Sequence, residues 1–330
     1  MRSTIAPILL AVVASTCLGT AAPLKAEKVS NSLAEVAITA DVVYGHKDGM
    51  ALTMDVFRPN KANGAAILFI NSGGFYSPVG DNRQCREKGG SEWATGTSEW
   101  KFITRAERDG NPVQQYSFQA LLENGFTVFD VRHGSTPKYN VEEIIGDCRQ
   151  AVRFVRAKAR EFSIDPSRIG VWGASSGGYL AALLGTASDE GNSESEDPIE
   201  RTSSRVQAIG LYYPAGYDFV SDVKRAPGVL QALPALQIGE EKLDAISIKK
   251  FISPDDPPAL IIYGKEDAFF ITEASEAMAS DFQKCGVPCR LVVYPDAGHM
   301  FRGKDENINA EYAEKAMSEL VGWFQKHLAR

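Results

Sequence analysis

Apolar residues along the chain follow two recurring patterns. Short apolar runs, typical of strands covered on both faces of a parallel sheet, alternate with longer segments whose apolar residues recur at helical spacing. This alternation predicts a doubly wound, mostly parallel sheet with helices on both faces. The expected strands are 65–70, 126–131, 206–213, 259–263 and 290–294, with one more around Ile169 to Trp172; the expected helices are 117–123, 141–162, 272–285 and 310–328, with one more directly after residue 175.

The segments before residue 60 follow a different pattern. Residues 35–59 form two alternating segments around His46-Lys47-Asp48-Gly49, whose Asp-Gly pair signals a hairpin turn. We therefore expect an antiparallel hairpin at one edge of the sheet. The long connections 76–116 and 214–258 are predicted loop or lid insertions. The acidic connection 188–205 is predicted to be a solvated loop that could be mobile.

The first residues of the chain have the order of a secretory signal peptide. Arg2 precedes an apolar run from Ile5 to Leu18, and small residues follow it. We predict a signal peptide over 1–26, one α/β domain over 27–330, and a periplasmic or secreted location. A retained N-terminal anchor is the alternative. The part after residue 26 has no second apolar run of membrane-spanning length.

Charge and cysteine content narrow the possible partners. The formal net charge is −7 and no basic stripe occurs, which argues against nucleic acid. No cysteine pair has zinc-site spacing with nearby histidines, so no structural metal is expected, and the serine chemistry described below implies no cofactor. In an oxidising compartment four cysteines could pair in three ways, with a Cys285–Cys289 clasp suggested by the short loop and Cys148 either free and buried or bridged to Cys85.

A candidate nucleophile lies between the run ending at Trp172 and the next helix. Gly173, Ser175 and Gly177 spell G-x-S-x-G, the pattern of a nucleophile elbow, and the glycines leave room for a sharp turn. The pattern is common by itself, so its strand-turn-helix context carries the prediction that Ser175 is the nucleophile. The alternative is a Gly/Ser-rich connection without chemistry.

A serine nucleophile needs a base that removes its proton and a carboxylate that orients the base. His327 lies within the last predicted helix, whereas His299 lies in a loop just after a strand, at the edge where open α/β sheets place their sites. We therefore predict His299 as the base. Asp267 follows another strand at the same edge and is the predicted acid. The competing carboxylates are Glu266 and Asp296.

Other site residues are expected at the same edge. Backbone N–H groups for an oxyanion should come from Ser176, directly after the nucleophile, and from Gly73 and Gly74 after the strand 65–70. For His133 an anchoring role in its loop is the favoured alternative to substrate contact, and for the aromatic residues simple packing is equally expected. The candidate substrate contacts are Phe75, Tyr76, His133, Tyr212 and Tyr213.

These stretches resemble the α/β-hydrolase superfamily, in the secreted esterase/lipase branch that includes hormone-sensitive-lipase-like and feruloyl- or acetylxylan-esterase-like enzymes. The resemblance implies the α/β-hydrolase fold and the same triad and oxyanion residues. Two positions depart from it: the family's His-Gly-Gly-Gly reads Asn71-Ser72-Gly73-Gly74, and Ala174 replaces an acid common in that branch. The matching stretches are INSGGF (70–75), DVRHGSTPKY (130–139), DPSRIGVWGASSGG (165–178), YYPAGYD (212–218), YGKED (263–267) and YPDAGHMF (294–301).

The sequence thus predicts an exported serine hydrolase that cleaves carboxylic esters, either short-chain or carbohydrate or aryl esters, through an acyl-enzyme. The expected partner is a small-molecule or carbohydrate ester. A serine peptidase of the prolyl-oligopeptidase type is the nearest alternative, although no propeller-length region precedes the domain. A non-catalytic envelope protein is the second alternative.

Overall fold

The computed structural model describes residues 36–77, 118–226, 228, 230, 233–267, 271–303 and 306–329. All of them belong to one packed unit, residues 32–330. The predicted signal peptide, nearly all of the 76–116 connection and Cys85 lie outside the described residues. Among the described helices, none combines the length and apolar character needed to cross a membrane.

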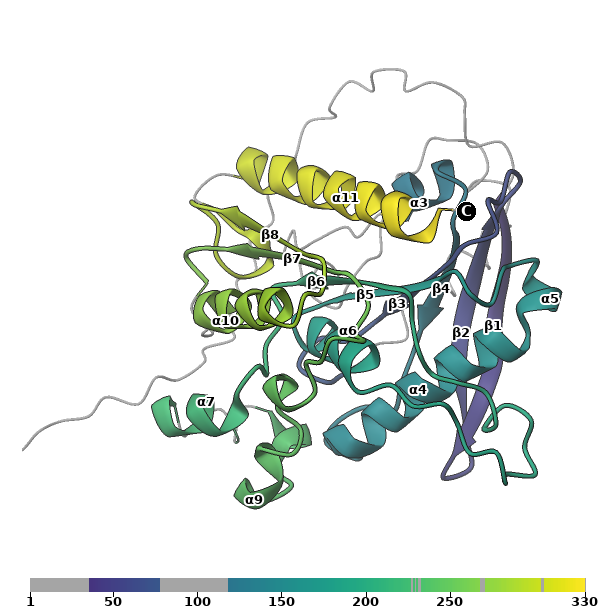
Figure 1. The fold of residues 1–330 in the computed structure, drawn as a ribbon, viewed down its shortest axis with the longest axis horizontal. Helices are drawn as coiled ribbons and strands as arrows, with labels where there is room; N and C mark the ends of the chain where they lie inside the picture. Colours follow the sequence, from purple (N-terminus) through teal and green to yellow (C-terminus); the bar gives the residue numbers. More distant parts are fainter. Residues whose placement is uncertain are drawn as a thin grey trace, which may run out of the picture. The chain divides into compact units, whose positions relative to one another are not determined.

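The core of the unit is a single eight-stranded sheet in the order β1-β2-β4-β3-β5-β6-β7-β8 (Figure 1). Strands β3 to β8 run parallel to one another, and the β1-β2 hairpin joins them through an antiparallel β2-β4 pair. The predicted α/β-hydrolase fold is therefore confirmed. The strands are β1 Val36–Lys47, β2 Met50–Pro59, β3 Ala66–Ile70, β4 Thr127–Val131, β5 Ile169–Ala174, β6 Ala208–Tyr212, β7 Ala259–Gly264 and β8 Cys289–Tyr294.

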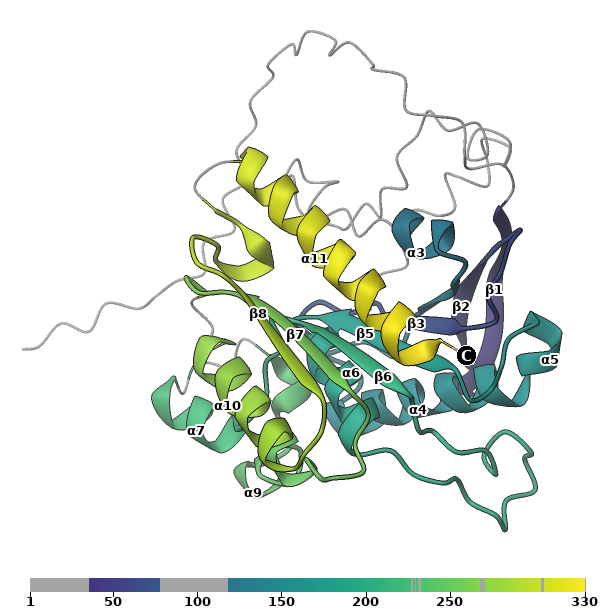
Figure 2. The same cartoon turned by 45° about the horizontal axis from the view of Figure 1, so that its top comes forward.

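Helices cover both faces of the sheet, as predicted. Helices α4, α6 and α10 pack on one face together with parts of 214–258, and α3 and α11 pack on the other. In the turned view α11 runs across the strands (Figure 2). The helices are α3 Gln119–Glu123, α4 Val141–Ala157, α5 Ala159–Phe162, α6 Ser176–Thr186, α7 Phe219–Arg225, α9 Glu240–Leu243, α10 Ile271–Lys284 and α11 Glu306–Leu328, with short 3₁₀ turns η1 Pro234–Leu236, η2 Ile248–Lys250 and η3 His299–Phe301.

Burial explains why the central strands are apolar throughout. Every residue of β3, β4, β5, β6 and β7 is buried, because helices cover both faces, whereas the edge strand β8 is only partly buried. Trp172 in β5 packs between Phe69, at a ring-centroid distance of 4.5 Å, and Tyr212, at 5.3 Å. The strands that precede Ser175 and Asp267, β5 and β7, are therefore fully buried, whereas β8, which precedes His299, is partly exposed at the edge of the sheet.

The structure contains the hairpin turn and the helix cap that the sequence indicated. Asp48 and Gly49 both have positive φ, 48° and 76°, as the predicted Asp-Gly hairpin turn requires. Asn140 caps α4 in a reciprocal pair with Glu143. The single helix expected over 141–162 is instead interrupted at Lys158, and its last turn, α5, ends at Ser163 in the left-handed conformation.

The 188–205 connection is anchored more firmly than its composition suggests. Arg156 donates hydrogen bonds to the carbonyls of Ser203 and Arg205, and Arg153 donates one to the Thr202 carbonyl. Two helix arginines therefore hold the end of an acidic, largely exposed segment. The acidic composition of this loop indicates that it is exposed, but it does not indicate the hydrogen bonds from Arg153 and Arg156.

The predicted Cys285–Cys289 clasp is wrong, since both thiols are free. Gly286, at φ 75°, closes the end of α10, and the Val287 N–H bonds back to the Phe282 carbonyl. The chain then enters β8, where Cys289 pairs with β7. Backbone hydrogen bonds thus set this turn, and the Cys285 thiol faces the Ile252 carbonyl instead. Cys148 is a free, fully buried thiol, one of the two outcomes left open.

Candidate active site

The candidate nucleophile occupies a strained turn between β5 and α6. Ser175 has φ 55° and ψ −120°, a conformation that L-residues rarely adopt and that costs on the order of 1–3 kcal/mol. Its N–H donates to the Tyr212 carbonyl and its carbonyl accepts from the Tyr179 N–H, so strand and helix both hold it. The turn leaves the Ser175 side chain partly exposed between two buried elements.

The glycines of the elbow are required by backbone contact. A Cβ added to Gly173 would lie 2.3 Å from the Gly177 carbonyl oxygen. One added to Gly177 would lie 2.5 Å from the carbonyl oxygen of Ile70, at the end of β3. The G-x-S-x-G spacing therefore reflects the close approach of three backbone segments, as predicted from the motif.

Two loops at the same sheet edge bring the base and the acid together. The loop after β7 and the loop after β8 are joined by hydrogen bonds from the Lys265 N–H to the Tyr294 carbonyl and from the Glu266 N–H to the Ala297 carbonyl. His299 begins η3 after the second loop, and Phe301 in the same turn is buried among aromatic rings. These contacts fix the position of the imidazole.

The three predicted triad residues form a continuous hydrogen-bonded chain. His299 Nδ1 lies 2.8 Å from Asp267 Oδ2, and His299 Nε2 lies 3.2 Å from Ser175 Oγ. Because an ionised carboxylate can only accept, Nδ1 carries the proton and Nε2 is left to accept from the serine hydroxyl. This is the tautomer in which imidazole can act as a base toward Ser175.

The rival residues lie elsewhere. Glu266 and Asp296 are exposed, whereas the Asp267 side chain is completely buried beside His299. His327 packs against Trp323 within α11, with ring centroids 4.1 Å apart and ring planes inclined by 49°. The geometry therefore selects Asp267 and His299 among the candidates that the sequence offered.

The three predicted oxyanion donors differ in whether their backbone N–H group is already hydrogen-bonded. The Gly73 N–H already donates to the Tyr76 carbonyl at 2.9 Å, so this residue does not offer the donor that the motif predicts. Gly74 has φ 57°, and no hydrogen bond among the described residues uses its N–H. Ser176 is the first residue of α6, where a backbone N–H has no partner within the helix. Gly74 and Ser176 are therefore the candidate donors.

Most predicted substrate contacts prove to be packing residues. Phe75 is 2% exposed and packs edge-on against Tyr179, and Tyr212 is 1% exposed in the core. Tyr213 is also buried, with its ring 4.8 Å from that of His299, so it supports the imidazole. Of the four predicted aromatic contacts, only Tyr76, at 44% exposure, remains open to a ligand. The other three rings fill space between neighbouring strands and loops.

His133 anchors its own loop, the alternative favoured from the sequence. Its side chain is buried, its Nδ1 donates to the Gly134 carbonyl at 2.7 Å, and its backbone N–H donates to Ser77 Oγ. Burial, which disfavours the charged ring, lowers the pKa of His133 to about 4. Its burial and its bond to the neighbouring carbonyl are what the anchoring role requires.

A buried ionic group lies beneath the candidate oxyanion loop. Arg132 Nη2 lies 2.6 Å from Asp55 Oδ2 and 3.3 Å from Asp130 Oδ2. Burial raises the pKa of Asp130 to about 6, while Arg132 and the Asn71 side chain act in the opposite direction. Asn71, which stands where the resembled family has histidine, thus connects the loop to this ionic group.

Sequence reasoning missed one apolar neighbour of the site. A Cβ added to Gly74 would lie 3.7 Å from Leu233 Cδ2, so the 214–258 insertion approaches the candidate oxyanion loop. The same insertion is held to α6 by a hydrogen bond from the Tyr179 hydroxyl to the Ile246 carbonyl. The sequence predicted 214–258 as a loop or lid insertion, but no sequence signal pointed to Leu233.

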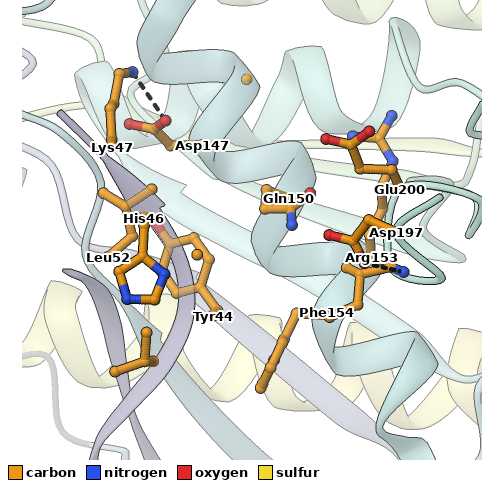
Figure 3. Close-up of a pocket in the computed structure, with 14 residues that line it drawn as sticks. Tyr44, His46, Lys47, Leu52, Asp147, Gln150, Arg153, Phe154, Asp197 and Glu200 are labelled. Carbon is orange, nitrogen blue, oxygen red and sulfur yellow. Dashed lines mark hydrogen bonds and ion pairs between the residues drawn. The ribbon is translucent and has the colours of Figure 1, made fainter. Parts of the chain in front are cut away.

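A separate pocket of about 580 Å³ lies between the hairpin, α4 and the 188–205 loop (Figure 3). Lys47 and Asp147 form an ion pair at its rim, with Nζ and Oδ1 2.9 Å apart. Gln150, Arg153 and Glu200 line it further along. None of the triad residues lines this pocket, so it is not the cavity in which Ser175 would act.

Comparisons with known proteins agree with this architecture. The BD-FAE family profile matches residues 90–282, and the dienelactone hydrolase family profile matches residues 246–328. Among curated proteins, a probable isoprenylcysteine alpha-carbonyl methylesterase, ICMEL1, from Arabidopsis thaliana is 24% identical over 55% of this chain and 40% of its own length. Esterase LipQ from Mycobacterium tuberculosis is 23% identical over 65% of this chain and 52% of its own. The chain therefore spans about half the length of these relatives.

Solved structures match over more of the chain. An acetyl ester-xyloside bifunctional hydrolase from Caldicellulosiruptor lactoaceticus superposes with a TM-score of 0.66 at 22% identity, covering 90% of this chain and 98% of that one. A thermophilic esterase from Thermogutta terrifontis gives a TM-score of 0.60 at 23% identity, covering 88% and 92%. At such low identity these matches establish the shared fold.

Proposed function

The chain belongs to the BD-FAE family, and on that premise we propose that it is a serine hydrolase that cleaves carboxylic esters through Ser175, His299 and Asp267. The observation that carries the proposal is the unbroken hydrogen-bonded chain from the Ser175 hydroxyl through the imidazole to the Asp267 carboxylate. The position of that chain, at the carboxyl ends of parallel strands, supports a reacting centre. The named esterases among the relatives support ester hydrolysis.

The proposed reaction has two stages. Ser175 Oγ attacks the ester carbonyl carbon while its proton passes to His299 Nε2, and Asp267 stabilises the resulting imidazolium. Backbone N–H groups of Gly74 and Ser176 would hold the negative charge that develops on the carbonyl oxygen. The C–O bond to the alcohol then breaks, and the alcohol leaves with the proton from His299 Nε2. Water then attacks the acyl carbon while His299 Nε2 takes its proton; the bond from that carbon to Ser175 Oγ breaks, the carboxylic acid leaves, and His299 returns the proton to Ser175 Oγ.

The proposed substrates are short acyl esters of sugars, aryl alcohols or simple alcohols. The acetyl ester hydrolase among the solved neighbours supports the acetyl end of this range. Leu233 also supports a confined acyl site, because it places an apolar side chain beside the backbone of Gly74, the proposed oxyanion donor. The signal-like pattern of residues 1–26 supports action outside the cytoplasm.

A substrate panel tests the proposal. We expect p-nitrophenyl acetate and butyrate to be hydrolysed faster than the octanoate and decanoate, and acetylated xylan and methyl ferulate to distinguish sugar from aryl esters. A fluorophosphonate should label Ser175, as located by peptide mass. The Ser175→Ala variant should lose both labelling and hydrolysis, with kcat reduced roughly 10⁴- to 10⁶-fold.

Two outcomes would contradict the proposal. Full ester hydrolysis by the Ser175→Ala variant would place the chemistry elsewhere. Cleavage of a glycyl-prolyl anilide, with acetyl esters untouched, would favour a serine peptidase that uses the same triad.

A further inference from the structure

Two serine hydroxyls join the candidate oxyanion loop, residues 71–75, to the nucleophile elbow. Ser72 Oγ and Ser176 Oγ lie 3.0 Å apart, although 104 residues separate them in sequence. The Ser176 hydroxyl also accepts a hydrogen bond from the Phe75 N–H at 3.0 Å. One buried side chain, 4% exposed, therefore contacts the loop on both sides of Gly73 and Gly74.

We propose that the Ser72 and Ser176 hydroxyls are positioning groups that hold the Gly74 N–H toward the same point as the Ser176 N–H. This inference rests on the proposed function, since it concerns the oxyanion of that reaction. It assigns the Ser176 side chain a role separate from that of its backbone N–H. Ser72 stands where the resembled family has glycine, so its hydroxyl adds a contact to Ser176 that a glycine could not make.

The loop needs such support because its backbone is unfavourable by itself. Gly74 has φ 57° and Phe75, which is not glycine, has φ 64°. A left-handed residue with a bulky side chain persists only where neighbouring contacts hold it. Phe75 is held by its ring packed on Tyr179, by its carbonyl, which accepts from the Thr136 N–H, and by its N–H, which donates to Ser176 Oγ. Removing the Ser176 hydroxyl would leave that N–H buried and without its acceptor.

The hydrogen-bonding capacity of two hydroxyls matches the arrangement. Ser176 Oγ accepts from the Phe75 N–H and still has one lone pair and its own proton for Ser72. The Gly177 backbone lies directly against the Ile70 carbonyl, so loop and elbow already touch at their bases. The hydroxyl pair then fixes the part of the loop that extends beyond this contact.

The proposal predicts a specific kinetic effect. Negative charge develops on the carbonyl oxygen as Ser175 attacks, so a displaced donor weakens transition-state binding more than substrate binding. Ser176→Ala should lower kcat about 10- to 100-fold with KM changed less than about threefold, which is a smaller loss than removing a donor outright. Ser72→Ala should lower kcat about 5- to 10-fold. The double variant should match Ser176→Ala, because both side chains act through one contact.

Ser204→Ala is the matched control. Ser204 is also fully buried, and its hydroxyl accepts the Asp189 N–H at 2.9 Å, but it lies in the 188–205 loop, which leads into the start of β6. Its substitution should lower the melting temperature about as much as Ser176→Ala does and leave kcat unchanged. Comparison of Ser176→Ala with Ser204→Ala therefore distinguishes the effect of losing a buried hydrogen bond from the effect of losing the position of the oxyanion donor.

The rate of Ser175 phosphonylation provides a second measurement that needs no ester. It should fall in Ser176→Ala and stay constant in Ser204→Ala, because the phosphoryl oxygen uses the same donors. Unchanged kcat and labelling rate in Ser176→Ala, with Ser175→Ala inactive, would overturn the positioning role and leave the proposed function intact. Absence of Ser175 labelling in the native protein would overturn both.

Discussion

Asp267 differs from the neighbouring carboxylates in burial and in contact. Its side chain is fully enclosed and bonds His299, while Glu266, adjacent in sequence, and Asp296, on the next loop, both face solvent. An enclosed carboxylate keeps the imidazole in one tautomer without competition from water. At the scale of single residues, burial and the contact with His299 thus distinguish the proposed acid, Asp267, from these two carboxylates.

Asp267→Asn should therefore reduce kcat on an active ester by about 10⁴-fold, because the amide can present its N–H₂ group to Nδ1 and reverse the tautomer. Asp296→Asn and Glu266→Gln should stay within about twofold of the native protein. Steady-state kinetics of the three variants, with melting temperatures to verify folding, provide the check. An equal loss in Asp296→Asn would contradict the assignment of the acid.

At the scale of elements, the ends of β7 and β8 control where His299 lies. Gly264, the last residue of β7, faces the loop after β8 so closely that an added Cβ would lie 2.2 Å from the Ala297 carbonyl oxygen. The hydrogen bonds between the two loops depend on this approach. A displacement of one loop would therefore move the imidazole relative to Ser175.

Gly264→Ala should lower the free energy of unfolding by about 1–3 kcal/mol through overpacking and reduce kcat about 10²-fold, since a shift near 1 Å is enough for such a loss. Gly322→Ala is the control, because a Cβ added at this exposed position of α11 would meet no described atom within 4 Å beyond the helix's own backbone. That substitution should raise the free energy of unfolding by about 0.5–1 kcal/mol. Urea denaturation and kcat test both, and an unchanged kcat in Gly264→Ala would contradict the expected loop displacement.

At the scale of the whole molecule, buried polar groups connect the hairpin to the parallel strands. Arg132, just after β4, is paired with Asp55 of β2, and His133 follows it in an enclosed loop. Removing charge-bearing groups from water is costly, so the balance between their charged and neutral forms differs between the folded and the unfolded chain. The stability of the protein consequently depends on pH through this region.

His133 should make the protein less stable as the pH falls from 6.5 to 4. Its folded-state pKa of about 4 lies below the ordinary value of 6.5, so the unfolded chain binds a proton in this range and the folded one does not. The neutral His133 ring contributes fully to the free energy of unfolding above pH 6.5. By pH 4 the free energy of unfolding is lower by about 3 kcal/mol through this group. Asp130, whose pKa is raised to about 6, acts in the opposite direction over part of the range.

His133→Gln isolates the histidine, because Asp130 and the neighbouring Lys47 are present in both proteins. Unfolding free energies measured at several pH values between about 4 and 7 should decline less in the variant than in the native protein toward acidic pH. Parallel pH profiles for the two proteins would show that His133 is not the group responsible.

The amino-acid sequence by itself determined the elements and their order. Alternating apolar periodicity, the Asp48-Gly49 turn, the Asn140 cap and the crowded glycines of the elbow are local signals, and local sterics and hydrogen bonding are enough to read them. The sequence also allowed Ser175, Asp267 and His299 to be predicted as neighbours, because each follows a strand and the carboxyl ends of parallel strands lie at one edge of the sheet.

Tertiary structure alone decided which groups are available for chemistry. It enclosed Phe75 and Tyr212, bonded the Gly73 N–H to Tyr76, and left the Cys285 and Cys289 thiols unbridged. It also brought Ser72 to Ser176 across 104 residues of sequence. The physical reason is that burial and hydrogen-bond pairing are set by contacts between distant segments, and no local pattern in the chain records them.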